Sequence, residues 1–306
     1  MRCYRAISIA AAGKDDISCE DALPADLDDW RRTMEFALGP YRFGTELKDL
    51  AVKEYAGSID RNPAVLCRQG AGVLLNKLAL GLPTRFFSPV TLVDWGDRSV
   101  TLDTSRGTLT ARAAIITAST AVLASGKIKF KPNLPTPYLK AFDTLKLGTY
   151  DKVAIEFDGN ALRLGANEVV FERALNGKAA ALFANVHATR LSTLILTGKN
   201  GAELADKGAS AMTDFALDWI SGMFGSSLKK SIVRTHAFSW NKQPWTLGAL
   251  SSANAGALEA RKILTEPVNG VLWFAGEAVN QTYWATVGGA WQDGERAADA
   301  AIAHLK

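Results

Sequence analysis

The sequence is poor in the residues that usually bind metal ions. Among its 306 residues are only three cysteines and three histidines. The cysteines form no CxxC pair, and no histidine has a cysteine, aspartate or glutamate at metal-ligand spacing, so we predict no metal site. An odd number of scattered cysteines is typical of a reduced protein. We therefore expect an intracellular, cytoplasmic protein.

The sequence also lacks clustered charge and long apolar runs. Its 35 basic and 31 acidic residues leave a net charge of +4, and the basic residues are scattered along the chain. A phosphate-binding surface needs clustered positive charge, so we expect no binding to nucleic acid. No apolar stretch approaches the ~20 residues of a membrane-spanning helix, so we expect no membrane insertion. With 48% hydrophobic residues, the chain can bury a core as one large domain or two smaller ones.

Periodic patterns along the chain predict a mixture of helices and strands. Residues 1–60 are predicted to be mainly helical. From Val90, short β-type runs with tight turns predict a meander that leads into a buried strand at residues 113–117. Residues 151–157 alternate between apolar and polar, which predicts a half-buried strand. Another helix is predicted at residues 203–223. The clearest helix covers the last twenty or so residues, where an apolar stripe recurs at Trp291, Gly294, Ala298, Ala301, Ile302 and Leu305.

The strongest local motif lies near the C-terminus. Residues 271–277 (VLWFAGE) are typical of a buried strand that ends in Gly276 and Glu277, and residues 286–290 (TVGGA) begin the terminal helix. Ligands of open α/β sheets bind outside the carboxyl ends of the strands. There Gly276 permits close approach, Glu277 can accept hydrogen bonds from ribityl or ribose hydroxyls, and the first helical amides can face an anionic or carbonyl oxygen. A flavin fits this pattern. A strand, loop and helix whose glycines merely allow tight packing is an equally weighted alternative.

This motif resembles the C-terminal flavin-contacting signature of the flavin-containing amine oxidases, the family of monoamine oxidases, polyamine oxidases and lysine-specific histone demethylases. The similar stretches are residues 274–278, 283–290 and 294–298. Upstream, the family's Trp, Pro-Tyr and Gly-Ser-Tyr-Ser elements are matched by residues 239–240, 243–245 and 248–251. The resemblance covers nearly the whole chain from about Asp16.

The resemblance implies an α/β fold with some α+β elements. It combines a truncated FAD-binding Rossmann-like domain with an interleaved substrate domain made of a mixed sheet and helices. The implied division assigns residues 1–62 to substrate-domain helices, residues 63–122 to part of the FAD domain, residues 123–242 to the substrate domain and residues 243–306 to the C-terminal part of the FAD domain.

The resemblance also implies which residues bind the cofactor. Val90 would contact the adenine end of FAD through its backbone, and Trp240 and Trp245 would form walls beside the flavin ring. The ribityl and pyrimidine parts would be held by Gly276, Glu277, Thr286 and Val287.

One lysine is the implied catalytic residue. Lys127 falls where the family carries a lysine that hydrogen-bonds, through a water molecule, to the reactive flavin nitrogen. Lys129 and Lys131 are close enough in the sequence to be rivals for this role. A lysine in such a run is otherwise a solvated residue at a strand edge, and the two alternatives carry equal weight.

The chain departs from the family at the cofactor link and at the amine cage. Ala249 stands where monoamine oxidases attach FAD through a cysteine, so the resemblance implies a non-covalent FAD. Leu250 and Thr286 stand where those enzymes place two tyrosines that guide the amine, so cation–π recognition is weakened or lost in this substrate pocket. Gly288 replaces a histidine that is frequent in the polyamine oxidase branch.

The family's N-terminal strand, GxGxxG turn and helix, which hold the FAD pyrophosphate, have no match in the chain. Residues 70–75 (GAGVLL) lack the third glycine and a following ribose-binding acid, and in the family this position opens a helix in the middle of the chain. Without the N-terminal unit, a parallel sheet would lose its central strands and expose apolar edges. We therefore expect a chain that begins inside a longer reading frame and is unstable alone, or one that needs a partner supplying a separate N-terminal FAD-binding half.

The leading hypothesis is a FAD-dependent oxidoreductase of the amine oxidase type, in which a hydride passes from the C–H bond of a small-molecule amine to a non-covalent flavin. The alternative is a truncated, non-catalytic fragment or partner subunit that does not bind FAD on its own. It is favoured by the absent glycine motif and the absent cage. A nicotinamide dehydrogenase is rejected because it also needs a phosphate-binding turn. The sequence does not identify the amine.

Overall fold

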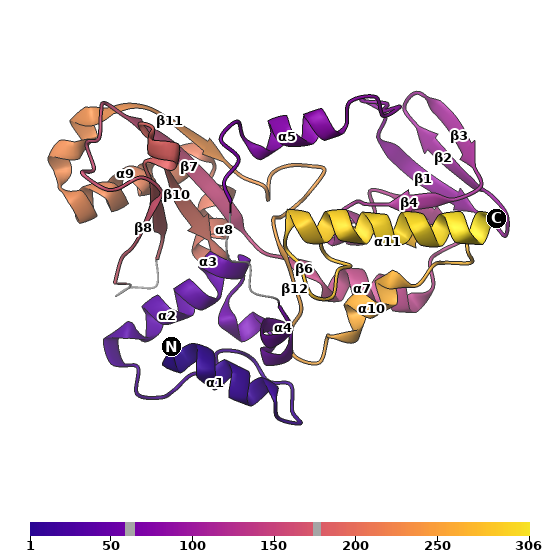
Figure 1. The fold of residues 1–306 in the computed structure, drawn as a ribbon, viewed down its shortest axis with the longest axis horizontal. Coiled ribbons are helices and arrows are strands. Elements are labelled where there is room, and N and C mark those ends of the chain that lie inside the picture. The colour runs from indigo at the N-terminus through magenta and orange to yellow at the C-terminus, as the bar shows by residue number, and fades with distance from the viewer. Residues whose placement is uncertain (59–64, 174–178) are drawn as a thin grey trace.

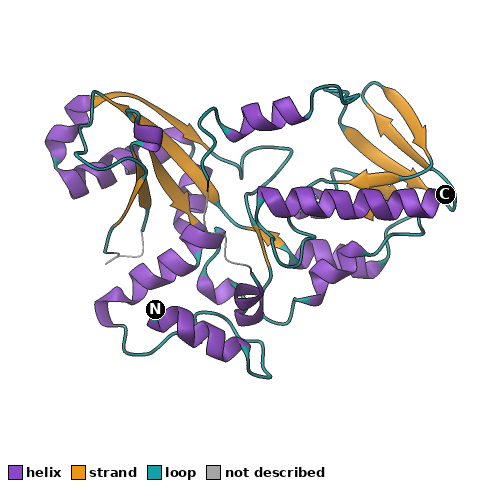
Figure 2. Ribbon diagram, in the orientation of Figure 1, coloured by secondary structure: helices purple, strands orange, loops and turns teal. Residues whose placement is uncertain are grey.

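The computed structural model of the chain describes residues 1–58, 65–173 and 179–306. Figure 1 shows a large sheet at one end, a group of small strands and helices at the other, and N-terminal helices below the large sheet. Figure 2 shows that helices and strands are mixed throughout the chain. The predicted α/β character is therefore confirmed.

The N-terminal residues are mainly helical, as predicted. The helices are α1 (Arg2–Ala11), η1 (Asp28–Trp30), α2 (Arg31–Leu38), α3 (Pro40–Phe43), η2 (Leu47–Asp49) and α4 (Val52–Gly57). Their core contains Ile7, Phe43 and Leu50, each fully buried. It also contains Trp284 from the C-terminal motif, whose ring stacks on Phe43 with 4.7 Å between the centroids. The two ends of the described chain thus share one hydrophobic core.

The large sheet has five antiparallel strands in the order β11-β7-β10-β9-β8. The strands are β7 (Tyr150–Phe157), β8 (Glu168–Phe171), β9 (Ala181–Ala184), β10 (Leu191–Thr197) and β11 (Ile232–Phe238), and short helices η3 (Val186–Ala188) and η4 (Ser226–Ser231) lie between them in sequence. The alternation predicted for residues 151–157 is confirmed, because Val153, Ile155 and Phe157 are fully buried against the helices that cover one face of the sheet.

Two helices cover that face where one was predicted at residues 203–223. They are α8 (Gly198–Lys207) and α9 (Ala209–Phe224). The break lies at Gly208, whose φ of +95° is strained for a residue with a side chain and cannot continue a right-handed helix. The prediction of a single helix was wrong because this glycine was counted as a helical residue.

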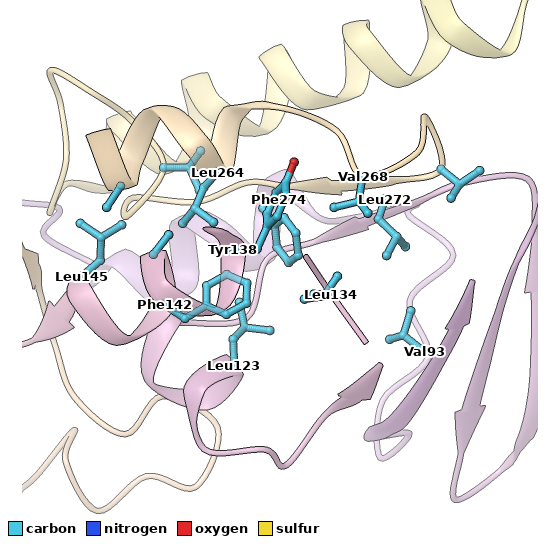
Figure 3. Packing of buried hydrophobic residues seen from close by; sticks show 14 of the residues in the cluster. Val93, Leu123, Leu134, Tyr138, Phe142, Leu145, Leu264, Val268, Leu272 and Phe274 are labelled. Carbon is cyan, nitrogen blue, oxygen red and sulfur yellow. The ribbon is translucent and has the colours of Figure 1, made fainter. Parts of the chain in front are cut away.

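At the other end, the predicted meander is confirmed. The strands β1 (Val90–Trp95), β2 (Val100–Thr104) and β3 (Gly107–Ala111) pair antiparallel, and β5 (Lys129–Lys131) adds a parallel strand beside β1. The helices next to this sheet are α6 (Thr120–Ala124), α7 (Thr136–Thr144) and α10 (Glu259–Thr265). They form a core around Phe274, with Tyr138, Phe142 and Leu264 packed closely about it (Figure 3). The pair β6 (Lys146–Leu147) and β12 (Ser251–Ser252) joins this end to the large sheet.

The strand predicted at residues 113–117 forms, but it is not buried. It is β4 (Ala114–Ile116), and it pairs in parallel with β13 (Leu272–Phe274). All of β13 is buried, whereas Ile115 of β4 is 38% exposed. Parallel strands are normally covered on both faces and extended by further strands. In the described residues this sheet has only two strands, so the outer edge of β4 is uncovered.

Two helices also expose apolar side chains. The C-terminal helix α11 (Val287–Leu305) forms as predicted, but its buried face carries Gly289, Asp293, Ala297 and Ala301. The predicted stripe was only partly right about the face: Ala301 is buried, but Trp291 and Ile302 are each 53% exposed. Helix α5 (Ala71–Leu78) has no buried residue at all and stands apart in Figure 1. As expected from residues 70–75, it begins directly after Gly70.

The predicted domain boundaries stay predictions. The boundary between residues 62 and 63 lies outside the described residues. Residues 123–145 pack in the core around Phe274, while residues 150–238 contain the large sheet.

Candidate functional site

A cavity of about 730 Å³ lies between the large sheet and the carboxyl ends of β4 and β13. One side of it is formed by residues 116–120 and 274–279, which follow these two strands. The other side is formed by β7 and by the loop of residues 240–250. Its volume is within the range of ~300–1,000 Å³ that is usual for small-molecule and cofactor sites.

Five of the predicted cofactor and substrate-pocket residues line this cavity. They are Trp240, Trp245, Leu250, Gly276 and Glu277. Trp240 is 41% exposed and Trp245 is 66% exposed, so both indole rings are accessible at the cavity. Ala249, at the position of the family's cysteine, is also part of the lining.

Gly276 ends β13 in a conformation that keeps the backbone open. Its φ is +144°, and a Cβ atom added there would have no heavy atom within 4 Å. Its amide donates to Oδ2 of buried Asp293 at 3.0 Å, and Arg296 donates to Oδ1 of the same carboxylate at 2.6 Å and to the Phe274 carbonyl at 2.9 Å. This pair in the first half of α11 fixes the end of the strand. The pair was not predicted. Its i, i+3 spacing of an acid and a base is visible in the sequence, but its position at the end of β13 is seen only in the structure.

The carboxylate of Glu277 is held by the protein itself. Its Oε2 accepts hydrogen bonds from the Ser251 hydroxyl at 2.8 Å and the Ala285 amide at 2.7 Å, and its Oε1 accepts from the Ser251 amide at 3.3 Å. Desolvation raises the pKa of Glu277, and the positive charge of Arg261 opposes this rise. Glu277 thus fixes the loop between β13 and α11.

Arg261 connects Glu277 to the N-terminal helices. Its side chain is 2% exposed. Its guanidinium donates to Ser251 Oγ at 3.0 Å and to the Ala278 carbonyl at 2.7 Å. Its Nε also donates to Oε1 of Glu54, on α4, at 2.9 Å. It also lies 4.8 Å from the centroid of the Trp284 ring. A buried arginine is tolerated where its donors are satisfied and its charge is paired. No sequence pattern indicated the pairing of Arg261 with Glu54, because these residues are 207 positions apart.

The loop that carries Trp240 and Trp245 is held by β7 and by the segment that follows β4. The Trp240 amide donates to Oδ1 of Asp151, a fully buried residue of β7, at 2.8 Å. Burial raises the pKa of the Asp151 carboxyl. The loop that carries Trp245 is held by the Ser119 hydroxyl, which donates to the Thr246 carbonyl at 2.6 Å.

Lys127 contacts the same loop. Its Nζ donates to the Pro244 carbonyl at 2.9 Å, next to Trp245, although Lys127 is not among the lining residues. Lys131 instead forms an ion pair with Asp94 at 3.2 Å, and Lys129 is exposed on β5. Of the three candidate lysines, Lys127 therefore has the contact with the cavity wall. Its catalytic role stays a prediction.

Three other predicted cofactor residues lie outside the lining. The Thr286 hydroxyl accepts from the Gly289 amide at 2.8 Å and donates to the Tyr283 carbonyl at 2.6 Å, which makes it the N-cap of α11. Val287 is exposed on the first turn of α11. Val90 is half-buried at the start of β1 and packs against the core around Phe274.

Two cations that the sequence did not single out do line the cavity. They are Arg42 of α3 and Lys152 of β7, and Tyr150 of β7 lies beside them in the lining. Neither cation forms an ion pair with a carboxylate of the described chain. They could not be predicted from the sequence, because the residue patterns of α3 and β7 indicate core packing and not a binding site.

Within residues 1–58, 65–173 and 179–306, no group of three or more His, Cys, Asp or Glu side chains could hold a metal ion. In the same residues no helix has the length and apolar character needed to cross a membrane.

Comparisons with known proteins give one consistent result. The model of the flavin containing amine oxidoreductase family matches residues 12–302. Lysine-specific histone demethylase 1B of Mus musculus is 27% identical over 241 residues, which cover 76% of this chain and 29% of that protein. Polyamine oxidase 4 of Oryza sativa subsp. japonica is 29% identical over 231 residues, which cover 74% of this chain and 46% of that protein.

Solved structures share the fold. Cyclohexylamine oxidase from Brevibacterium oxydans IH-35A superposes with a TM-score of 0.75 at 19% identity, over 98% of this chain and 68% of its own. Putrescine oxidase bound to putrescine superposes with a TM-score of 0.79 at 17% identity, over 97% of this chain and 72% of its own. The chain spans 29% and 30% of the length of two demethylase relatives, from Mus musculus and Homo sapiens.

Proposed function

This chain belongs to the flavin containing amine oxidoreductase family, and we propose that it provides the ring-binding and substrate-facing part of a FAD-dependent amine oxidoreductase. The observation that carries the proposal is the cavity at the carboxyl ends of β4 and β13, walled by Trp240 and Trp245 and bordered by the open backbone of Gly276. This is the place where open α/β sheets bind their ligands.

The residues present fit the ring end of a flavin. Residues 274–276 and 116–120 present an uncharged surface with polar hydroxyls, and the two indoles line the same cavity. Ala249 has no nucleophilic atom, so the flavin would be bound non-covalently. When bound, FAD would supply the acceptor for the hydride that leaves the amine C–H bond.

The protein side of the reaction is mostly positioning. Asp151 fixes the backbone of Trp240, and Ser119 and Lys127 hold the loop that carries Trp245. Glu277, satisfied by Ser251 and Ala285, keeps the strand end and the start of α11 in one arrangement. We assign Lys127 the role of hydrogen-bonding a water molecule at the ring edge, with its ammonium held at the Pro244 carbonyl.

The described residues contain no glycine-rich turn that could bind the phosphate groups of FAD. No residue of α5 lines the cavity, and no glycine-rich turn follows a strand there. We therefore include in the proposal a separate N-terminal FAD-binding half. The uncovered edge of β4, the exposed helix α5 and the outer face of α11 support this partner, because apolar surfaces of this extent normally meet another surface.

The same uncovered surfaces favour the second candidate function. In it, the chain is a non-catalytic fragment or partner subunit that does not bind FAD on its own. The two candidates differ in whether flavin is retained once the missing half is supplied.

The test is flavin retention by the purified chain. We expect little flavin absorbance from the chain alone, and stoichiometric flavin after mixing with the GxGxxG-containing polypeptide encoded beside or upstream of this chain. The variant Ala249→Cys should then keep flavin after acid denaturation, whereas Ala249→Ser, its control of similar size, should release it. Absence of flavin from both the chain and the mixture would rule out the enzyme and support the non-catalytic alternative.

A further inference from the structure

The two cationic side chains of the cavity lie on one of its sides, whereas its acidic side chain, Glu277, follows β13 on the other. Residues 116–120 and 274–276, on the side that follows β4 and β13, contribute no charged side chain. Arg42 of α3 and Lys152 of β7 line the opposite side together with Tyr150. The side that would face a substrate, rather than the flavin ring, therefore has a positive charge.

No carboxylate of the described chain neutralises these two cations. Glu277, the acid in the lining, is bonded to Ser251 and Ala285 and interacts electrostatically with Arg261. The neighbouring Asp151 is directed toward the Trp240 amide, since successive residues of a strand point to opposite faces.

Both cations lie close to aromatic rings. The Arg42 guanidinium lies 5.2 Å from the Phe43 centroid and 5.4 Å from the Tyr55 centroid, and the Lys152 ammonium lies 5.7 Å from the Tyr150 centroid. Partial burial lowers the pKa of Lys152. Two cations that line the same cavity without a carboxylate partner gain from a bound anion.

We propose, resting on the amine oxidoreductase function proposed above, that Arg42 and Lys152 select an amine that also carries a carboxylate. The substrate class would be amino-acid-like. Charge-assisted hydrogen bonds to the carboxylate favour such a molecule, and repulsion from two cations disfavours a diamine or polyamine. The lining charge thus points to a different substrate from the one named for putrescine oxidase.

The anion could also be a phosphate group of the cofactor, and the experiment separates the two sources. Isothermal titration calorimetry on the flavin-free chain at pH 7 would compare three ligands that share one aromatic ring. Phenylalanine has an amine and a carboxylate, 3-phenylpropionate has only the carboxylate, and 2-phenylethylamine has only the amine. Inorganic pyrophosphate is the fourth ligand.

We expect phenylalanine and 3-phenylpropionate to bind about tenfold more tightly than 2-phenylethylamine, because a charge-assisted hydrogen bond contributes about this much. Lys152→Met and Arg42→Met should each weaken both carboxylates about tenfold, and Arg42→Lys should keep part of the affinity. The control is Lys230→Met, which removes an exposed lysine outside the cavity and should change nothing.

Tighter binding of 2-phenylethylamine than of both carboxylates, or no saturable binding of either carboxylate, would overturn the proposal. It would also be overturned if only pyrophosphate bound in an Arg42- and Lys152-dependent way, or if Arg42→Met and Lys152→Met bound both carboxylates as tightly as the unchanged chain. None of these results depends on flavin or turnover, so failure of the proposed function would be seen separately, in the flavin absorbance.

Discussion

The two sides of the cavity belong to regions that differ in how completely they are covered. The large sheet packs its inner face under α8 and α9, and Val153, Ile155 and Phe157 there are fully buried. The elements β4, α5 and α11 leave large apolar side chains exposed, including Ile115 and Trp291. Both regions have ordinary hydrophobic patterns in the sequence. The proposed N-terminal half would account for this difference, because it would cover apolar side chains that the described residues leave exposed.

The largest expected contrast is between equivalent truncations in the two regions. Phe157→Ala should destabilise the chain by about 3–5 kcal/mol, because it removes a ring from a closed core. Leu74→Ala, in the middle of α5, should change the free energy of unfolding by no more than about 0.5 kcal/mol in the chain alone, since Leu74 is exposed and alanine favours a helix. Urea unfolding followed by circular dichroism measures both. A loss of more than about 2 kcal/mol for Leu74→Ala would show that α5 is already covered.

A second prediction concerns the buried ion pair that joins the N-terminal helices to the cavity. Arg261→Met should cost about 3–5 kcal/mol, because it leaves the Glu54 carboxylate buried without its partner. The double variant Arg261→Met/Glu54→Gln should recover part of this loss. The exposed pair of Lys229 and Asp218 offers a matched control, and Lys229→Met there should cost no more than about 1 kcal/mol. Equal losses for Arg261→Met and Lys229→Met in urea unfolding would contradict the role given to Arg261.

The contrast between the regions also explains how much of the fold could be predicted from the sequence. The alternation at residues 151–157 and the meander from Val90 were predicted correctly, because each pattern meets its partner within the described chain. The strand at residues 113–117 and the stripe on the terminal helix were assigned correctly as elements, but their burial was wrong. The apolar side chains of these two elements have no covering partner among the described residues, so their pattern alone did not predict their exposure.

Local motifs led to some of the residues that line the cavity, although their binding roles stay predictions. Gly276 and Glu277 were found because a strand end, a glycine and an acid are adjacent in the sequence. Arg42, Lys152 and Arg261 were missed because their positions depend on packing between distant segments. Thr286 was assigned to the cofactor, and the structure shows it as the N-cap of α11.

The most direct test of the account is hydrogen–deuterium exchange of the chain alone and of the chain mixed with the GxGxxG-containing half and FAD. We predict that amides of α5 and β4 exchange rapidly in the chain alone and become protected in the mixture, while those of β7 and β10 are protected in both. Unchanged rapid exchange of α5 and β4 in the mixture would contradict the claim that this uncovered region is the docking surface of a flavin-binding half.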